Sequence, residues 1–155
     1  MDFRIELLGK ENLVRGFEGL VRYAGNLRPI FTEIHKDFLK MEKENFDKVG
    51  FPEKFKALSR VYRRRKSKKA PGQPIMQLSG DLRGSLTGER SGHIFEFIND
   101  IKVRMGSSVK YAHRHQVGHK MPRRRIIQLT PERKKSWSYF IHRFLVKGIK
   151  EQLSG

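Results

Sequence analysis

The feature that most constrains the fold is an apolar series near the start of the chain, whose members lie three or four residues apart. This spacing places them on one face of an α-helix. Pro29 interrupts the series and follows Gly25-Asn26, a pair typical of a helix end, whereas proline suits the first turn of a new helix. The sequence therefore predicts two helices, roughly 11–25 and 28–48, that face one core. The series consists of Leu13, Phe17, Leu20, Ala24, Leu27, Phe31, Ile34, Phe38 and Met41.

A second helical pattern, with a clear start, occupies the C-terminal part of the chain. Thr130-Pro131-Glu132 supplies a capping hydroxyl, a proline for the first helical position and an acid for the first turn. Apolar residues then recur at helical spacing through about residue 153. We expect Trp137 to anchor the core rather than to bind a ligand.

Between these helices the pattern changes to that of a β-hairpin. Residues 93–98 are apolar with partial alternation, Asn99-Asp100 is a turn signal, and residues 101–106 alternate cleanly. Ile101, Val103 and Met105 would then face the core. Residues 126–129 are apolar enough to add a further strand.

A short helical turn is expected before the hairpin. Ser79 would cap it, and Leu78, Leu82 and Leu86 would lie on one side of it.

Together these patterns predict an α+β fold in a single domain, residues 1–155. It comprises two N-terminal helices, a small antiparallel β-meander with a long basic loop, and a C-terminal helix packed on the sheet. Residues 1–8 alternate charged with apolar side chains, which suits a strand and lacks the features of an export signal. No run reaches the ~18 apolar residues that cross a bilayer, so we expect no membrane contact.

The positive charge of the chain is concentrated in two stretches. There are 34 Lys+Arg and 16 Asp+Glu, a net charge of +18, and residues 60–69 and 102–125 hold seven and eight basic side chains with no acid. The first stretch lies in a segment without periodicity, about 50–76, which we interpret as a long exposed loop. Two interpretations stay open: solvated surfaces, or contact with a polyanion or an acidic protein. The basic residues of this loop are Arg60, Arg63, Arg64, Arg65, Lys66, Lys68 and Lys69.

Few residues suggest catalysis. The chain has no cysteine, and its sequence contains no phosphate-binding glycine loop, serine elbow or paired-carboxylate motif. His113, His115 and His119 would have to converge to bind zinc or copper, and no acid between residues 101 and 131 could orient them. Capping and turn formation explain Ser79 and Ser85 better than nucleophilic catalysis does. We therefore predict that the protein is not an enzyme and has no catalytic residue, cofactor or metal site.

Five short motifs occur in an order that resembles the phage virion morphogenesis family. The family pattern is aromatic-x-x-Leu-Ser, Thr/Ser-Gly-x-Leu-x-x-Ser, Gly-Ser-x-x-x-Tyr-Ala, His-Gln-Phe-Gly and Ile-Pro-Ala-Arg-Pro-Phe-Leu. The resemblance spans about residues 10–150 and is most specific from 106 to 129. The matching segments are Phe55-Lys56-Ala57-Leu58-Ser59, Leu78-Ser79-Gly80-Asp81-Leu82-Arg83-Gly84-Ser85-Leu86, Gly106-Ser107-Ser108-Val109-Lys110-Tyr111-Ala112, His115-Gln116-Val117-Gly118 and Met121-Pro122-Arg123-Arg124-Arg125.

The chain departs from this pattern at four positions. Phe55 stands where the family often has tryptophan, and Val117 replaces the aromatic residue of the fourth motif. Arg123 and Arg125 replace the alanine and the second proline of the fifth. These departures leave the expected fold intact but change the surface that a neighbouring subunit would meet.

The resemblance implies a structural tail-completion or head–tail joining protein, a neck or connector component of tailed phages and related prophages. Such a protein is expected to form a homo-oligomeric ring, here of six copies, at the junction where the genome passes from head to tail. It implies as partners other neck and tail proteins, with non-specific DNA contact in the channel. It also implies a location in the virion after assembly in the host cytoplasm.

Residues of the later motifs are expected to shape a subunit or partner contact. Gly118 would let backbones approach closely and Pro122 would supply a rigid turn. The alternative is ordinary β-edge and turn chemistry, with Pro122 fixing a bend before the last strand. The expected contact residues are Tyr111, His115, Gly118, Pro122 and Arg124.

We expect the basic loop to dock onto an acidic face of a neighbour and to become ordered on assembly. The alternative function is a basic nucleic-acid-binding module that contacts DNA or RNA phosphates. In that case residues 60–69 and 102–125 would share one face.

Overall fold

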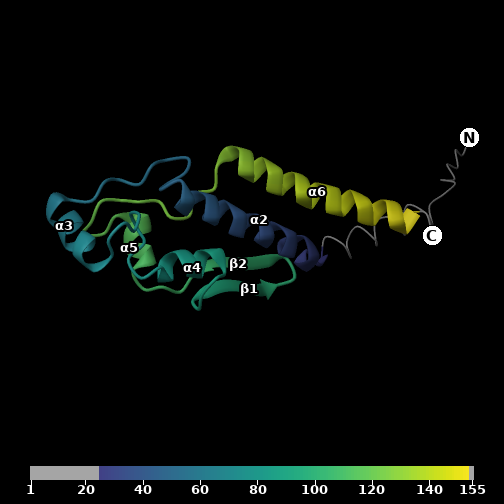
Figure 1. The fold of residues 1–155 in the computed structure, drawn as a ribbon. Helices are drawn as coiled ribbons and strands as arrows, with labels where there is room; N and C mark the ends of the chain where they lie inside the picture. The colour runs from purple at the N-terminus through teal and green to yellow at the C-terminus, as the bar shows by residue number, and fades with distance from the viewer. Residues whose placement is uncertain (1–24, 154–155) are drawn as a thin grey trace, which may run out of the picture.

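Helix α2 (Arg28–Asp47) is the element around which the described residues, 25–153 of this computed structural model, are arranged (Figure 1). Pro29 lies in its first turn, and the Asn26 side chain accepts a hydrogen bond from the Arg28 backbone at 3.2 Å. The predicted helix over 28–48 is therefore confirmed. The predicted strand 1–8 and the predicted helix 11–25, up to residue 24, lie outside the described residues.

The buried face of α2 supports two clusters of apolar side chains. One cluster surrounds the C-terminal half of α2 and the other surrounds its N-terminal half, and Trp137 and Met105 contact both. This arrangement follows from the helical spacing of the apolar residues, which gives α2 one continuous buried stripe. The buried members of the first cluster are Phe38, Met41, Phe46, Phe55, Leu82, Leu86, Ala112 and Ile126, and those of the second are Ile30, Phe31 and Ile34.

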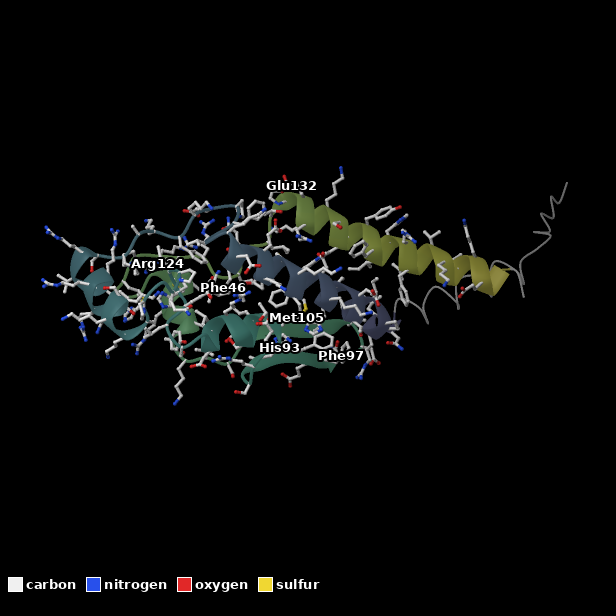
Figure 2. The ribbon with its side chains drawn as sticks, in the orientation of Figure 1. Phe46, His93, Phe97, Met105, Arg124 and Glu132 are labelled. Carbon is white, nitrogen blue, oxygen red and sulfur yellow. The ribbon has the colours of Figure 1, made fainter. Side chains whose placement is uncertain are left out.

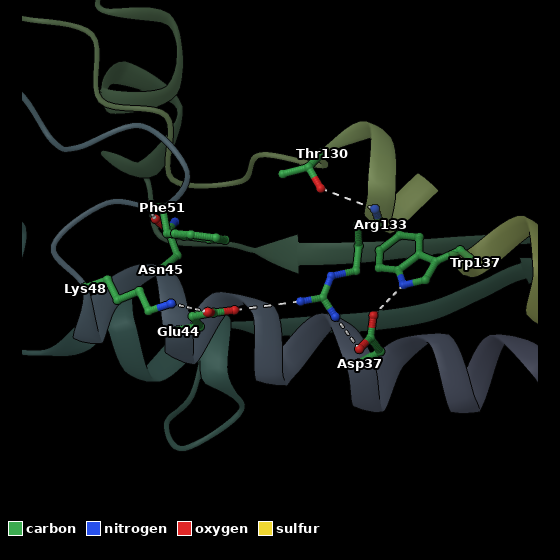
Figure 3. Close-up of polar contacts among 8 residues, drawn as sticks. All are labelled: Asp37, Glu44, Asn45, Lys48, Phe51, Thr130, Arg133 and Trp137. Carbon is green, nitrogen blue, oxygen red and sulfur yellow. Dashed lines mark hydrogen bonds and ion pairs between the residues drawn. The ribbon is translucent and has the colours of Figure 1, made fainter. Parts of the chain in front are cut away.

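Helix α6 (Pro131–Leu153) runs along one side of α2 and is joined to it by polar contacts (Figures 1 and 3). The Thr130 hydroxyl caps it by accepting a hydrogen bond from the Arg133 backbone at 3.2 Å. The Asp37 carboxylate accepts hydrogen bonds from Arg133 Nη1 at 2.5 Å and from Trp137 Nε1 at 2.6 Å. The predicted C-terminal helix is confirmed, but it packs on α2 rather than on the sheet, because the hairpin lies on the other side of α2 (Figure 1). Trp137 anchors the core as expected.

The predicted hairpin is confirmed on the other side of α2. Strand β1 (His93–Asn99) pairs with β2 (Lys102–Ser107) in antiparallel register, with an irregularity between Phe97 and Asn99. Val103 and Met105 pack against the core. Ile101 does not, because it lies in the turn, where its side chain is 52% exposed.

The predicted short helical turn is observed as helix α4 (Asp81–Thr87), which differs from the prediction in two respects. Its N-cap is Gly80, with φ +86°, rather than Ser79, whose hydroxyl bonds the Asp81 backbone and carboxylate. Leu82 and Leu86 are buried as predicted, but Leu78 is 49% exposed. The positive φ at Gly80 breaks the helical phase between Leu78 and Leu82.

The prediction of a long loop over 50–76 is wrong for residues 60–69, which form helix α3 (Arg60–Lys69). Ser59 accepts a hydrogen bond from the Tyr62 backbone at 3.3 Å and caps this helix. Arginine and lysine favour helices even without an apolar face, so periodicity did not reveal it. Ordering of these residues on assembly stays a prediction.

The predicted strand over 126–129 is wrong as well, since these residues form neither helix nor strand. Their backbone instead bonds to side chains. Gln116 accepts hydrogen bonds from the Ile126 and Ile127 backbone at 2.8 and 3.1 Å and donates to the Ile127 carbonyl at 2.8 Å. Asn45 donates to the Ile126 carbonyl at 2.6 Å. These side chains replace a partner strand.

One interpretation assigned Tyr111-Ala112 to β-edge or turn structure, but Ala112 begins helix α5 (Ala112–Val117), with Tyr111 at its N-cap. Pro122 therefore does not precede a last strand. None of the helices within residues 25–153 combines the length and apolar character that crossing a membrane requires.

Candidate binding cleft

A cleft of about 560 Å³ lies at the end of the molecule that holds α3 and α5 (Figure 1). Four segments far apart in the sequence line it: 58–66, 76–79, 111–115 and 120–124. Each of the motif segments beginning at Phe55, Leu78, Gly106, His115 and Met121 contributes at least one side chain to its walls. The fold thus brings together residues that the sequence singled out separately.

Arg124 fastens the wall of the cleft to the segment before α3 (Figure 2). Its side chain is 5% exposed and donates to the Lys56 carbonyl at 2.7 Å and the Ala57 carbonyl at 3.1 Å. Its backbone N–H donates to the His115 carbonyl at 2.9 Å. Burial lowers the pKa of Arg124, and Tyr62 partly opposes this shift. The charge is held by carbonyl dipoles rather than by a carboxylate.

Lys66 fixes α3 in the same way. Its ammonium group is buried and donates to the carbonyls of Gln73 and Pro74 at 2.5 and 2.6 Å. Burial lowers the pKa of Lys66. The other six basic residues of α3 are exposed, so this helix places positive charge beside the cleft.

His115 and Tyr111 form the wall contributed by α5. Their rings pack edge to face with centroids 6.1 Å apart. His115 Nδ1 is buried and has no hydrogen-bond partner within the described residues. Burial, and secondarily the Arg124 charge, lowers the pKa of His115, which therefore stays neutral at pH 7.

Gly118 does not line the cleft but ends α5. Its φ is +84°, and a Cβ added there would lie 2.9 Å from Arg123 Cβ. This close approach explains the glycine, because it lets the chain turn back so that residues 120–124 can line the cleft.

Four of the five predicted contact residues line the cleft: Tyr111, His115, Pro122 and Arg124. Tyr62, Leu78 and Lys120, which were not among the predicted contact residues, line it too. Tyr62 could have been identified as a binding residue because it is the aromatic residue within the basic run 60–69. Leu78 gave the wrong signal, because its spacing from Leu82 suggested the core.

The two basic stretches do not share one face as whole segments. The later part of residues 102–125 lies beside α3, whereas β2, which begins at Lys102, runs from the far end of the molecule (Figures 1 and 2). The charge around the cleft therefore comes from α3 together with residues 120–125.

The residues lining the cleft are apolar, uncharged polar or basic. None of the described residues lining it is an aspartate or glutamate. Residues 25–153 contain no group of three or more histidine or acidic side chains placed to hold a metal ion. His113 and His119 are exposed, while His115 faces the cleft.

Comparison with protein-family models matches residues 9–143 to the phage virion morphogenesis family. No match was found among curated proteins or among solved structures.

Proposed function

The chain belongs to the phage virion morphogenesis family and so has a role in phage virion assembly, and from this premise we propose that it is a tail-completion or head–tail joining component. In this proposal it forms a ring, of about six copies, at the junction between tail tube and head.

The observation that carries this proposal is the meeting of the motif segments at one cleft. Motifs that serve only the core would be scattered over the buried faces of the elements. Here Leu58, Leu78, Tyr111 and Pro122 come from four different motifs and line the same opening. Exposed apolar side chains gathered at one place are typical of a protein interface.

The shape of the molecule suits a ring. A ring requires two different surfaces on each subunit, because every contact joins one surface to the other around an axis. The end that holds α3 and α5 carries six exposed cations, whereas the hairpin turn, which lies away from it, exposes the apolar Ile98 and Ile101 (Figure 1).

Family membership also indicates a structural rather than a catalytic protein. The buried polar groups of the cleft agree with this assignment. Arg124 and Lys66 each donate to two backbone carbonyls, as expected for positioning residues.

The proposal is tested in the phage or prophage that encodes the chain. Deleting the gene should leave heads and tails separate, and supplying the intact chain should restore joined particles, counted by electron microscopy. The purified protein should form a closed ring at high concentration in native mass spectrometry. Infectious, joined particles that lack the chain would refute the proposal.

Native mass spectrometry also distinguishes the proposed structural role from the alternative of a nucleic-acid-binding module. A short DNA duplex is added at two salt concentrations. Tight binding by a monomer, with affinity that falls steeply as salt rises, would favour that alternative. A ring whose mass does not change on adding DNA would favour the structural role.

A further inference from the structure

The walls of the cleft are largely apolar and partly uncovered. Leu58, Met76 and Met121 lie deeper, and Leu78 and Tyr111 at the rim are 49% and 40% exposed. Tyr62, also at the rim, is 45% exposed. Methionine side chains adapt their shape to a partner, and tyrosine is enriched where proteins bind each other.

The charge around these apolar walls has one sign. The lining contributes Lys66, Lys120 and Arg124 and no acid. Among the described residues, none of these three forms an ion pair with a carboxylate within 4 Å. The six exposed cations of α3 extend the field outward. An acidic occupant would therefore gain electrostatic energy that the chain itself leaves unused.

A polypeptide satisfies these features better than a nucleic acid does. Phosphates would be drawn to the exposed arginines of α3, but a DNA duplex carries no apolar group that could enter a cleft of about 560 Å³. A peptide can combine acidic side chains for the rim with an apolar anchor for the walls.

We propose that the cleft between α3 and α5 binds an acidic segment of a neighbouring virion protein, which inserts an apolar or aromatic side chain between Leu78 and Tyr111. Its carboxylates face Lys120 and the exposed side of α3. The inference rests on the proposed function for the kind of partner, but the binding chemistry is read from the cleft alone.

The test measures binding of the full-length protein to a fluorescein-labelled peptide by fluorescence polarisation. The probe is a short peptide of aspartates and glutamates around a central Phe-Leu pair. Two control peptides replace either Phe-Leu by Ser-Ser or every acid by its amide. Both controls should bind at least about fivefold more weakly than the probe, since each lacks one of the two complementary features.

Matched variants assign the binding to the cleft. Leu78→Ser and Lys120→Glu alter exposed cleft residues and should weaken binding at least about fivefold. Val117→Ser and Lys110→Glu alter residues that are also exposed but do not line the cleft, so they should leave the affinity within about twofold. Circular dichroism of all four variants checks that each is folded.

Three results would overturn the inference. One is equal binding of the probe and its Ser-Ser control, and another is equal weakening by the cleft variants and their matched controls. The third is binding of a DNA duplex, but not the probe, with an affinity insensitive to Leu78→Ser.

Counting joined particles by electron microscopy distinguishes a failure of this inference from a failure of the proposed function. If heads and tails require the chain but join normally with Leu78→Ser and Lys120→Glu combined, the cleft inference fails and the proposed function stands. If the chain proves unnecessary for joining while the cleft variants alone lose the probe, the proposed function fails and the acidic-peptide site stands.

Discussion

Replacing Glu42 by glutamine should stabilise the protein at neutral pH. Glu42 lies on the buried face of α2 with 0% exposure, and neither carboxylate oxygen has a hydrogen-bond partner among the described residues. The amide of the neighbouring Asn45 donates to Ile126 instead. Burial raises the pKa of Glu42 from 4.5 to about 8, and Asn45 offsets only part of this shift.

The size of the effect follows from the linkage between proton binding and folding. At pH 7 the unfolded carboxyl is ionised and the folded one is mostly protonated, so folding takes up a proton. Proton uptake becomes about 1.4 kcal/mol less favourable for each pH unit above 4.5, so it lowers the free energy of unfolding by roughly 3 kcal/mol at pH 7. Because the folded pKa is the higher one, the contribution is most favourable below pH 4.5 and is lost as the pH rises toward 8.

Glutamine has a similar shape and no titration, so the advantage of Glu42→Gln should grow with pH. Urea unfolding followed by Trp137 fluorescence should give similar stabilities for the two proteins at about pH 4, with the variant more stable by about 3 kcal/mol at about pH 7. Glu33→Gln, an exposed carboxyl on the same helix, is the matched control and should show no such growth. A difference between variant and parent that does not change with pH would refute the reasoning.

Three further substitutions test how the cleft and the helices are held. Gln116→Ala removes three hydrogen bonds to the backbone of residues 126–127 and should reduce the free energy of unfolding by about 2–4 kcal/mol in urea titrations. Gly118→Ala should destabilise by at least about 1 kcal/mol more than Gly72→Ala, because both glycines have positive φ but only Gly118 lacks room for a Cβ; equal losses would contradict the close approach. Asp37→Ala leaves two donors of α6 without their acceptor and should lower the midpoint of thermal unfolding, with a loss of about 2–4 kcal/mol.

The parts of the fold that could be predicted are those whose signal is local. Helix α2 buries one continuous apolar stripe, and α6 has a half-buried one. The first turn of α2 contains a proline and α6 begins after a capping threonine, so both helices can be predicted from neighbouring residues. The hairpin followed from a turn pair between two alternating runs. Helix α3 was missed because an exposed helix lacks the apolar periodicity that reveals the others.

The remaining errors depend on contacts between distant segments. Residues 126–129 resemble a strand, but Gln116 and Asn45 reach their backbone before any strand can. Leu78 has the spacing of a core residue, yet the left-handed conformation of Gly80 turns it toward the cleft. The motifs identified most of the residues that line the cleft, but only the fold shows that they meet.

In helix α3, the residue that attaches the helix to the fold is different from the residues that set its surface charge. Lys66 alone among its residues is buried and attaches the helix to the 73–74 turn, while six cations project into solvent. Substitutions among those six can therefore alter the net charge of this end of the molecule with little effect on folding. Single substitutions among these cations could change which acidic surface the proposed contact recognises, while the contacts of Lys66 that hold α3 in place stay the same.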